Sequence, residues 1–208
     1  MHLIFNSPHE HGNVVFNFTR RPIDDLIAFA LGYSKAGHEL AAQFAAGRGY
    51  GDYEGYPILY LYRHALELYL KAVVYRGAKL LKLVTQESVN TDHLFQRHDL
   101  ARWLPAIQAI SKQMKWNFDG SGLASWEGFA SFLHKLDSID AGSYAFRYPI
   151  NRIGEAQLPP HFVVNVVLFA EQMDGILQLL DGAAAQIDEH WEAEVETRCE
   201  LERLAPDL

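Results

Sequence analysis

The stretch that decides the fold runs from Pro57 to Arg76 and reads PILYLYRHALELYLKAVVYR. At about 100° per residue, its polar side chains share one arc of roughly 100° on a helix. These side chains belong to Tyr60, Arg63, His64, Glu67 and Lys71. Nearly every other position is apolar, so neighbouring elements must cover the remaining sides. We therefore expect the central helix of a helical bundle here, beginning at Pro57 and ended by Gly77.

The polar arc has two interpretations. Arg63, Glu67 and Lys71 are spaced by four residues, and such pairs stabilise an exposed helix face by a few tenths of a kcal/mol each. A narrow charged strip on an otherwise apolar helix is also typical of a cleft lining. The helix alone leaves both interpretations open.

Apolar residues at spacings of three and four predict four further helices. The one before the central helix starts at Pro22 and ends at Gly47. The others run from Asp99 to about Met114 with a bend at Pro105, from about Ser121 to Ser138, and onward from near His161. Asp99 is suited to cap its helix, although it could instead face a ligand.

The predicted architecture is all-α: an antiparallel up-and-down helical bundle over residues 21–185. Residues 1–20 contain two short β-prone runs around a turn-rich segment, which predicts a hairpin or an extended arm. Residues 186–208 form an acidic helical tail with eight acidic and two basic side chains. This tail carries 2 − 8 = −6 of the chain's net charge of 18 − 26 = −8. It is a solvated helix end or an arm that covers a basic site or a partner.

Composition excludes several functional classes. No apolar run reaches the roughly 18 residues of a membrane span, and the first residues lack a secretory leader. A single cysteine, Cys199, excludes an internal disulfide and a cysteine-rich zinc site. A nearly neutral body does not bind duplex DNA by counterion release alone, which leaves a local basic cleft open. From the missing membrane span and leader and the single cysteine we expect a cytoplasmic protein without membrane contact. We expect no metal or cofactor, and phosphate-loop, zinc-protease and serine-hydrolase motifs are all missing from the sequence.

The central stretch also carries a recognisable motif. Arg63-His-Ala-Leu-Glu-Leu-Tyr-Leu-Lys-Ala72, followed by Gly77, a polar loop and His98-Asp-Leu100, resembles the HEPN family over about Tyr56–Trp103. The resemblance implies an antiparallel helical bundle that pairs as a homodimer. It also implies one cleft, and the residues assigned to that cleft are Arg63, His64, Glu67, Lys71, His98, Asp99 and Arg147.

Many HEPN proteins are metal-independent ribonucleases with an arginine followed, after four to six residues, by a histidine. No arginine of this chain has a histidine at that spacing; Arg152 comes nearest, with His161 nine positions later. The departure favours a catalytically silent member that binds RNA, a nucleotide or a partner protein, in a bacterial stress or phage-defence system. Two alternatives stay open: a divergent endoribonuclease that uses Arg147 or Arg152 with His161 or His64, and a purely structural dimerising protein.

Arg147 is the strongest of the catalytic candidates, with His161 as its partner. It lies between two aromatic residues, in Phe146-Arg-Tyr-Pro149. This setting suits an arginine that holds a phosphate or stacks on a base. The alternative is that Arg147 pairs with Glu67 or Asp137 and fixes an irregular loop to the bundle.

Overall fold

The computed structural model describes residues 14–15, 19–20, 23–47, 51–85, 89–118, 125–140 and 142–204. Within these ranges the regular elements are helical, with one isolated β-bridge between Ile150 and Ala156. The all-α class is therefore confirmed. The predicted N-terminal hairpin or arm lies almost wholly outside the described residues.

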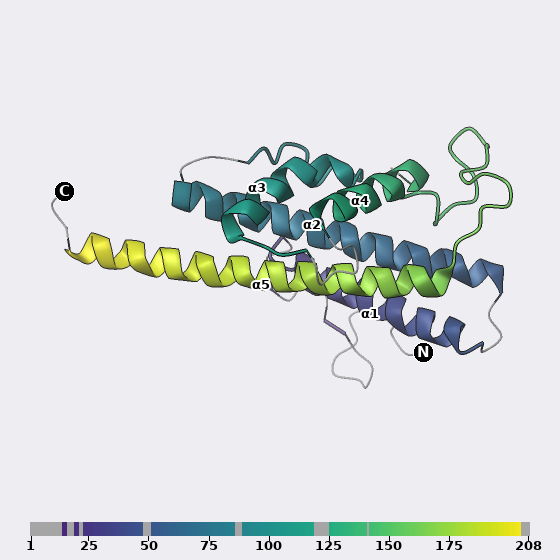
Figure 1. Ribbon diagram of the computed structural model, residues 1–208, viewed down its shortest axis with the longest axis horizontal. Helices are drawn as coiled ribbons and strands as arrows, with labels where there is room; N and C mark the ends of the chain where they lie inside the picture. Colours follow the sequence, from purple (N-terminus) through teal and green to yellow (C-terminus); the bar gives the residue numbers. More distant parts are fainter. Residues whose placement is uncertain are drawn as a thin grey trace, which may run out of the picture.

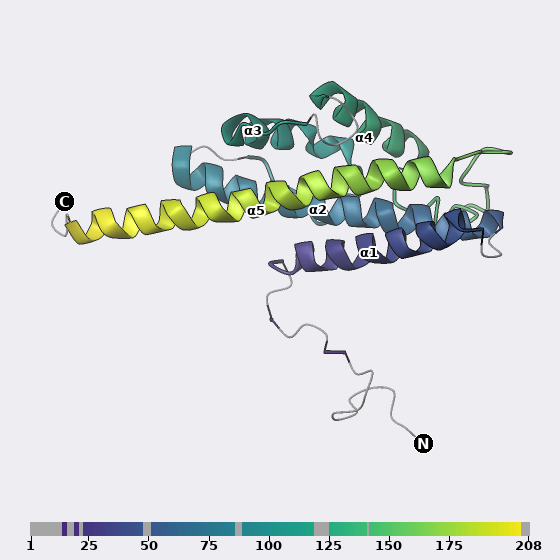
Figure 2. The ribbon, with the colours of Figure 1, turned by 60° about the horizontal axis from the view of Figure 1, so that its bottom comes forward.

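The helices lie in three layers (Figures 1 and 2). α1 covers one side, α2 and α5 run side by side in the middle, and α3 and α4 cover the other side. The elements are α1 (Leu26–Ala45), η1 (Asp52–Glu54), α2 (Gly55–Thr85), η2 (Ala101–Trp103), α3 (Leu104–Met114), α4 (Trp126–Asp140) and α5 (Val166–Leu204). Over the described ranges, no helix has both the length and the apolar character needed to cross a membrane.

The α2 helix is the centre of the core, as its sequence predicts. Ala65, Leu66, Leu70 and Val73 are all fully buried. The helix is longer than expected, because Gly77 lies inside it instead of ending it. A Cβ at Gly77 would lie 2.4 Å from Ile110 Cδ1, so the glycine allows α3 to approach the α2 backbone closely.

The α1 and α2 helices are antiparallel, whereas α2 and α5 are parallel. Three side-chain hydrogen bonds join α2 and α5 among the described residues, each between residues 112 positions apart. They are Tyr62 Oη to Asp174 Oδ1 at 2.8 Å, Tyr69 Oη to Asp181 Oδ1 at 2.9 Å, and Arg76 Nη1 to Asp188 Oδ2. The constant offset requires both helices to run in one direction, which departs from strict up-and-down alternation. Residues 89–100 make this possible by leading back along α2: Phe95 lies at Tyr75 and His98 at Arg63, so α3 runs in the direction of α2 and α4 returns the chain to the end where α2 begins (Figure 1).

The start of the third predicted helix differs from expectation. Asp99 does not cap it; the backbone N–H groups of Leu100 and Ala101 donate to the Asp137 carboxylate of α4 at 2.9 and 2.7 Å. Asp99 instead pairs with Arg97, with 3.3 Å between Asp99 Oδ1 and Arg97 Nε. The cap is thus supplied by an element distant in sequence.

Two further details of the predicted helices differ in the structure. Pro105 occupies the first turn of α3 and does not bend it, because the missing proline N–H has no helical acceptor there. The last helix begins at Val166, not His161, which has a left-handed φ of 56°. α5 then continues unbroken to Leu204, so the described part of the acidic tail is helical and extends beyond the other helices (Figure 2).

Candidate functional site

The charged strip of α2 is buried. Arg63, Glu67 and Lys71 are 0%, 3% and 4% exposed. Arg63 Nη1 donates to Glu67 Oε2 at 3.0 Å, and Lys71 Nζ donates to Glu67 Oε1 at 2.7 Å. The strip is therefore neither a solvent-facing helix surface nor the wall of an open cleft.

Residues from outside α2 complete this buried group. His98 Nδ1 lies 2.8 Å from Glu67 Oε1, while the His98 side chain remains 43% exposed. Asp137 and Asp140 of α4 lie 4.0 and 3.3 Å from the Arg63 guanidinium. We call the six residues the Arg63 cluster: Arg63, Glu67, Lys71, His98, Asp137 and Asp140.

The Arg63 cluster joins α2 to the irregular segment that follows α4. Arg63 Nε donates to the backbone carbonyl of Asp140 at 3.1 Å. Asp140 Oδ1 in turn accepts the N–H groups of Tyr144 and Ala145 at 2.7 and 2.9 Å. The buried guanidinium thus fixes the point where residues 142–165 leave the bundle.

The pKa values of Glu67 and Asp137 are shifted in opposite directions. Burial alone would raise the pKa of Glu67, but hydrogen bonds from Lys71 and His98 and the charge of Arg63 together lower it. Burial raises the pKa of Asp137 despite its two backbone N–H donors. Glu67 is therefore a stable anion between two buried cations.

Arg147 lies apart from the Arg63 cluster, in a group that we call the Arg147 cage. Its guanidinium carbon is 5.4, 5.0 and 5.7 Å from the ring centroids of Tyr60, Tyr144 and Tyr148. Arg147 Nε donates to the Ser143 carbonyl at 2.6 Å, and the side chain is exposed. No carboxylate in the described ranges forms an ion pair with Arg147, so the predicted pairing with Glu67 or Asp137 is wrong.

His64 lies next to this cage. Its ring stacks on Tyr60 with centroids 5.6 Å apart and meets the edge of Tyr33 at 4.5 Å. Burial lowers the pKa of His64. The nearby positive charges of Arg147, Arg63 and Lys71 lower it further, whereas the negative charge of Glu67 opposes the shift. His64 and Arg147 therefore both contact the Tyr60 ring.

Two hollows flank the segment after α4. One, of about 620 Å³, is lined by Tyr144, Tyr148 and Arg152 among others, so Arg152 shares two tyrosines with the Arg147 cage. The second, of about 640 Å³, is lined by His161. Arg147 and His161 do not line a common hollow among the described residues.

The seven residues assigned to one cleft are thus divided. Arg63, Glu67, Lys71 and His98 contact one another, His64 and Arg147 meet through Tyr60, and Asp99 joins neither group.

Sequence reasoning placed Tyr148 beside Arg147, but it did not place Tyr60 and Tyr144 there, nor Asp137 and Asp140 with Arg63. A signal was available for each. Asp137 and Asp140 are three residues apart on α4, and Tyr144 and Tyr148 flank Arg147 four residues apart.

Comparisons add no relative to this picture: no family model, curated protein or solved structure matches the chain. Nor does the described part of the chain contain three or more His, Cys, Asp or Glu side chains placed to hold a metal ion.

Proposed function

We propose that this protein is a catalytically silent, HEPN-like helical protein that binds single-stranded RNA or a nucleotide at the Arg147 cage. One observation carries the proposal: Arg147 is exposed, surrounded by three tyrosine rings, and forms no ion pair with a described carboxylate. A planar guanidinium suits a phosphate, and tyrosine rings stack on bases of any sequence. Arg152 in the adjoining hollow supplies a second cation for the backbone.

The Arg63 cluster has a supporting role in this proposal. Its buried side chains cannot touch a large ligand, but Arg63 and Asp140 together fix the start of the segment that carries Arg147. The family resemblance further implies that two copies pair and that the protein belongs to a stress or phage-defence system. Sedimentation velocity of the full chain tests the pairing.

Fluorescence anisotropy with a labelled ten-nucleotide oligoadenylate, in chelator, tests the binding site. We expect saturable binding that weakens as salt increases, and at least a tenfold loss of affinity in Arg147→Ala. Arg102→Ala is the matched control, because Arg102 is also exposed and lies 5.8 Å from an aromatic centroid, that of Trp103. Equal affinity of the two variants would place RNA elsewhere, and ATP competition distinguishes a nucleotide pocket from an RNA surface.

An endoribonuclease that uses Arg147 with His64 is the second candidate. The shared contact with Tyr60 favours it, and a lowered pKa leaves His64 uncharged and able to accept a proton at neutral pH. The same RNA, incubated in chelator, should be cleaved by the native chain and left intact by both Arg147→Ala and His64→Phe. An intact substrate with the native chain excludes this candidate, and absence of both cleavage and binding leaves the structural alternative.

A further inference from the structure

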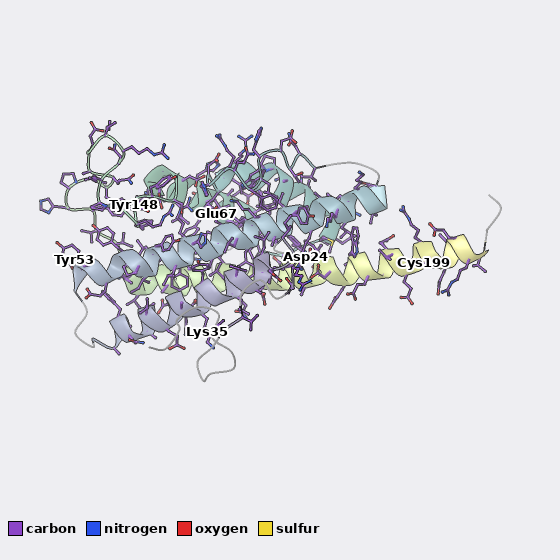
Figure 3. The ribbon with its side chains drawn as sticks, turned by 180° about the vertical axis from the view of Figure 1, so that it is seen from behind. Asp24, Lys35, Tyr53, Glu67, Tyr148 and Cys199 are labelled. Atoms are coloured by element: carbon purple, nitrogen blue, oxygen red, sulfur yellow. The ribbon has the colours of Figure 1, made fainter. Side chains whose placement is uncertain are left out.

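The second hollow has a chemistry opposite to that of the Arg147 cage. It lies at the end of the bundle where α2 and α5 begin, the end at which Figure 3 labels both Tyr53 and Tyr148. Its volume of about 640 Å³ falls within the range of small-molecule sites. Five of its lining residues are aromatic: Phe44, Tyr53, Tyr56, Phe146 and Phe162.

The charge of this hollow is negative. Asp52 lines it, is exposed, and forms no ion pair in the described part of the chain. Glu54, in the same turn of η1, adds a second negative charge, with its Oε2 accepting the Gly51 N–H at 2.8 Å. No described lysine or arginine lines the hollow. Among the described lining residues Asp52 is the one carboxylate and His161 the one imidazole, so no permanent cation is present to hold a phosphate or carboxylate.

We propose that this hollow binds an organic ammonium ion that carries an apolar body. Aromatic rings present their negative faces to a cation, and a neighbouring carboxylate adds direct attraction. Asp52, Tyr53 and Tyr56 would hold the cationic head at the open side, because they are the exposed acidic and tyrosine members of the lining. The other exposed lining residues are Pro149, Ala156, Pro159, His161 and Val163. Leu59 and Phe146 are buried and would contact the apolar body. The site is independent of RNA binding.

Calorimetric titration of the full chain with choline and with 3,3-dimethyl-1-butanol tests the charge requirement. The two compounds have the same shape, but a neutral carbon replaces the nitrogen in the alcohol. We expect choline to bind at least tenfold more tightly than the alcohol. Hexyltrimethylammonium should bind more tightly still, by about fourfold for each methylene that becomes buried. Equal binding of choline and the alcohol, or no binding of either at 10 mM, overturns the proposal.

Variants locate the site. Asp52→Asn should reduce choline affinity at least tenfold, to that of the alcohol, and Tyr53→Leu should reduce it several-fold. Both positions are exposed, so neither change threatens folding. Asp92→Asn, an exposed carboxylate far from the hollow in sequence, is the matched control and should bind choline normally. Unchanged binding in Asp52→Asn overturns the proposal, whereas Arg147→Ala should leave choline binding intact whether or not the protein binds RNA.

Discussion

Arg63 donates a hydrogen bond from Nη2 to the backbone carbonyl of His98 at 2.7 Å, across 35 residues of sequence. The same guanidinium reaches the Asp140 carbonyl through Nε at 3.1 Å. One buried side chain thus fixes both the entry to η2 and the exit from α4. We therefore expect single substitutions of Arg63 or its anionic partner Glu67 to reduce the free energy of unfolding most.

Replacing Glu67 by glutamine should destabilise the fold by about 3 kcal/mol, because it leaves Arg63 and Lys71 as buried cations without their shared anion. Urea unfolding followed by circular dichroism measures the loss. Lys71→Met should cost clearly less, since Glu67 retains Arg63 and His98. The double variant should be more stable than the sum of the two losses predicts, and additive losses would contradict the coupling between them.

The pH dependence of stability should carry a contribution from His64. Its pKa is lowered from the ordinary 6.5 in the folded chain, so the unfolded chain binds the proton more readily. The free energy of unfolding therefore falls as the pH drops below about 6.5. The pKa of Glu67 is lowered from 4.5 in the folded chain, so its protonation reduces the free energy of unfolding only in more acidic solution.

Urea titrations at pH 7.5, 6.5 and 5.5 measure this contribution. His64→Phe retains a ring against Tyr60 and should lose less stability on acidification than the native chain. His93→Gln changes an exposed histidine and should follow the native profile. Identical slopes for His64→Phe and the native chain would show that burial does not disfavour protonation of His64.

Two glycines inside helices should respond to alanine in opposite directions. Gly77→Ala should cost about 1–3 kcal/mol, because the new methyl group would meet Ile110 Cδ1 at 2.4 Å. Gly182→Ala in α5 has no atom within 4 Å of its Cβ and should stabilise the chain by about 0.5–1 kcal/mol. Thermal unfolding compares them. Ile110→Val removes Cδ1. Combined with Gly77→Ala it should recover part of the lost stability, whereas in the native chain it should not be stabilising.

The contacts between α2 and α5 should each stabilise the pair measurably. Tyr69→Phe removes the hydroxyl that donates to Asp181 at 2.9 Å and leaves a partly buried carboxylate oxygen without that donor. The expected cost is about 1–2 kcal/mol in urea unfolding. Tyr75→Phe is the control, since the Tyr75 hydroxyl has no hydrogen-bond partner among described residues. A loss of similar size in both variants would contradict a role for the hydrogen bond to Asp181.

Features that depend on local spacing could be predicted from sequence. Arg63, Glu67 and Lys71 share one arc because their spacing matches the helical period, and they do contact one another. The apolar remainder of the Pro57–Arg76 stretch correctly indicated a covered central helix. The contact of His98 with Glu67 joins the two halves of the motif formed by Arg63–Ala72 and His98–Leu100, and helical spacing alone does not predict it.

Features that depend on tertiary packing could not be predicted from the sequence. A glycine is a usual helix terminator, yet Gly77 lies inside α2, where Ile110 of α3 occupies the space that a side chain would need. Asp99 has the side chain of a good cap, but Asp137 takes that role from a distant helix. Likewise, the path of the chain after α4 brings Arg147 to Tyr60 instead of the Arg63 cluster, and helical periodicity says nothing about that path.

The parallel pairing of α2 and α5 has a consequence for how the chain is made. Each of the three side-chain hydrogen bonds between these helices joins positions 112 residues apart, which is a large sequence separation for a helical protein. During synthesis, α1 and α2 emerge first and can form their local hairpin, but α2 keeps an uncovered apolar face until α5 leaves the ribosome. Nascent chains stopped before residue 174 should therefore depend on chaperones, whereas the completed chain should not.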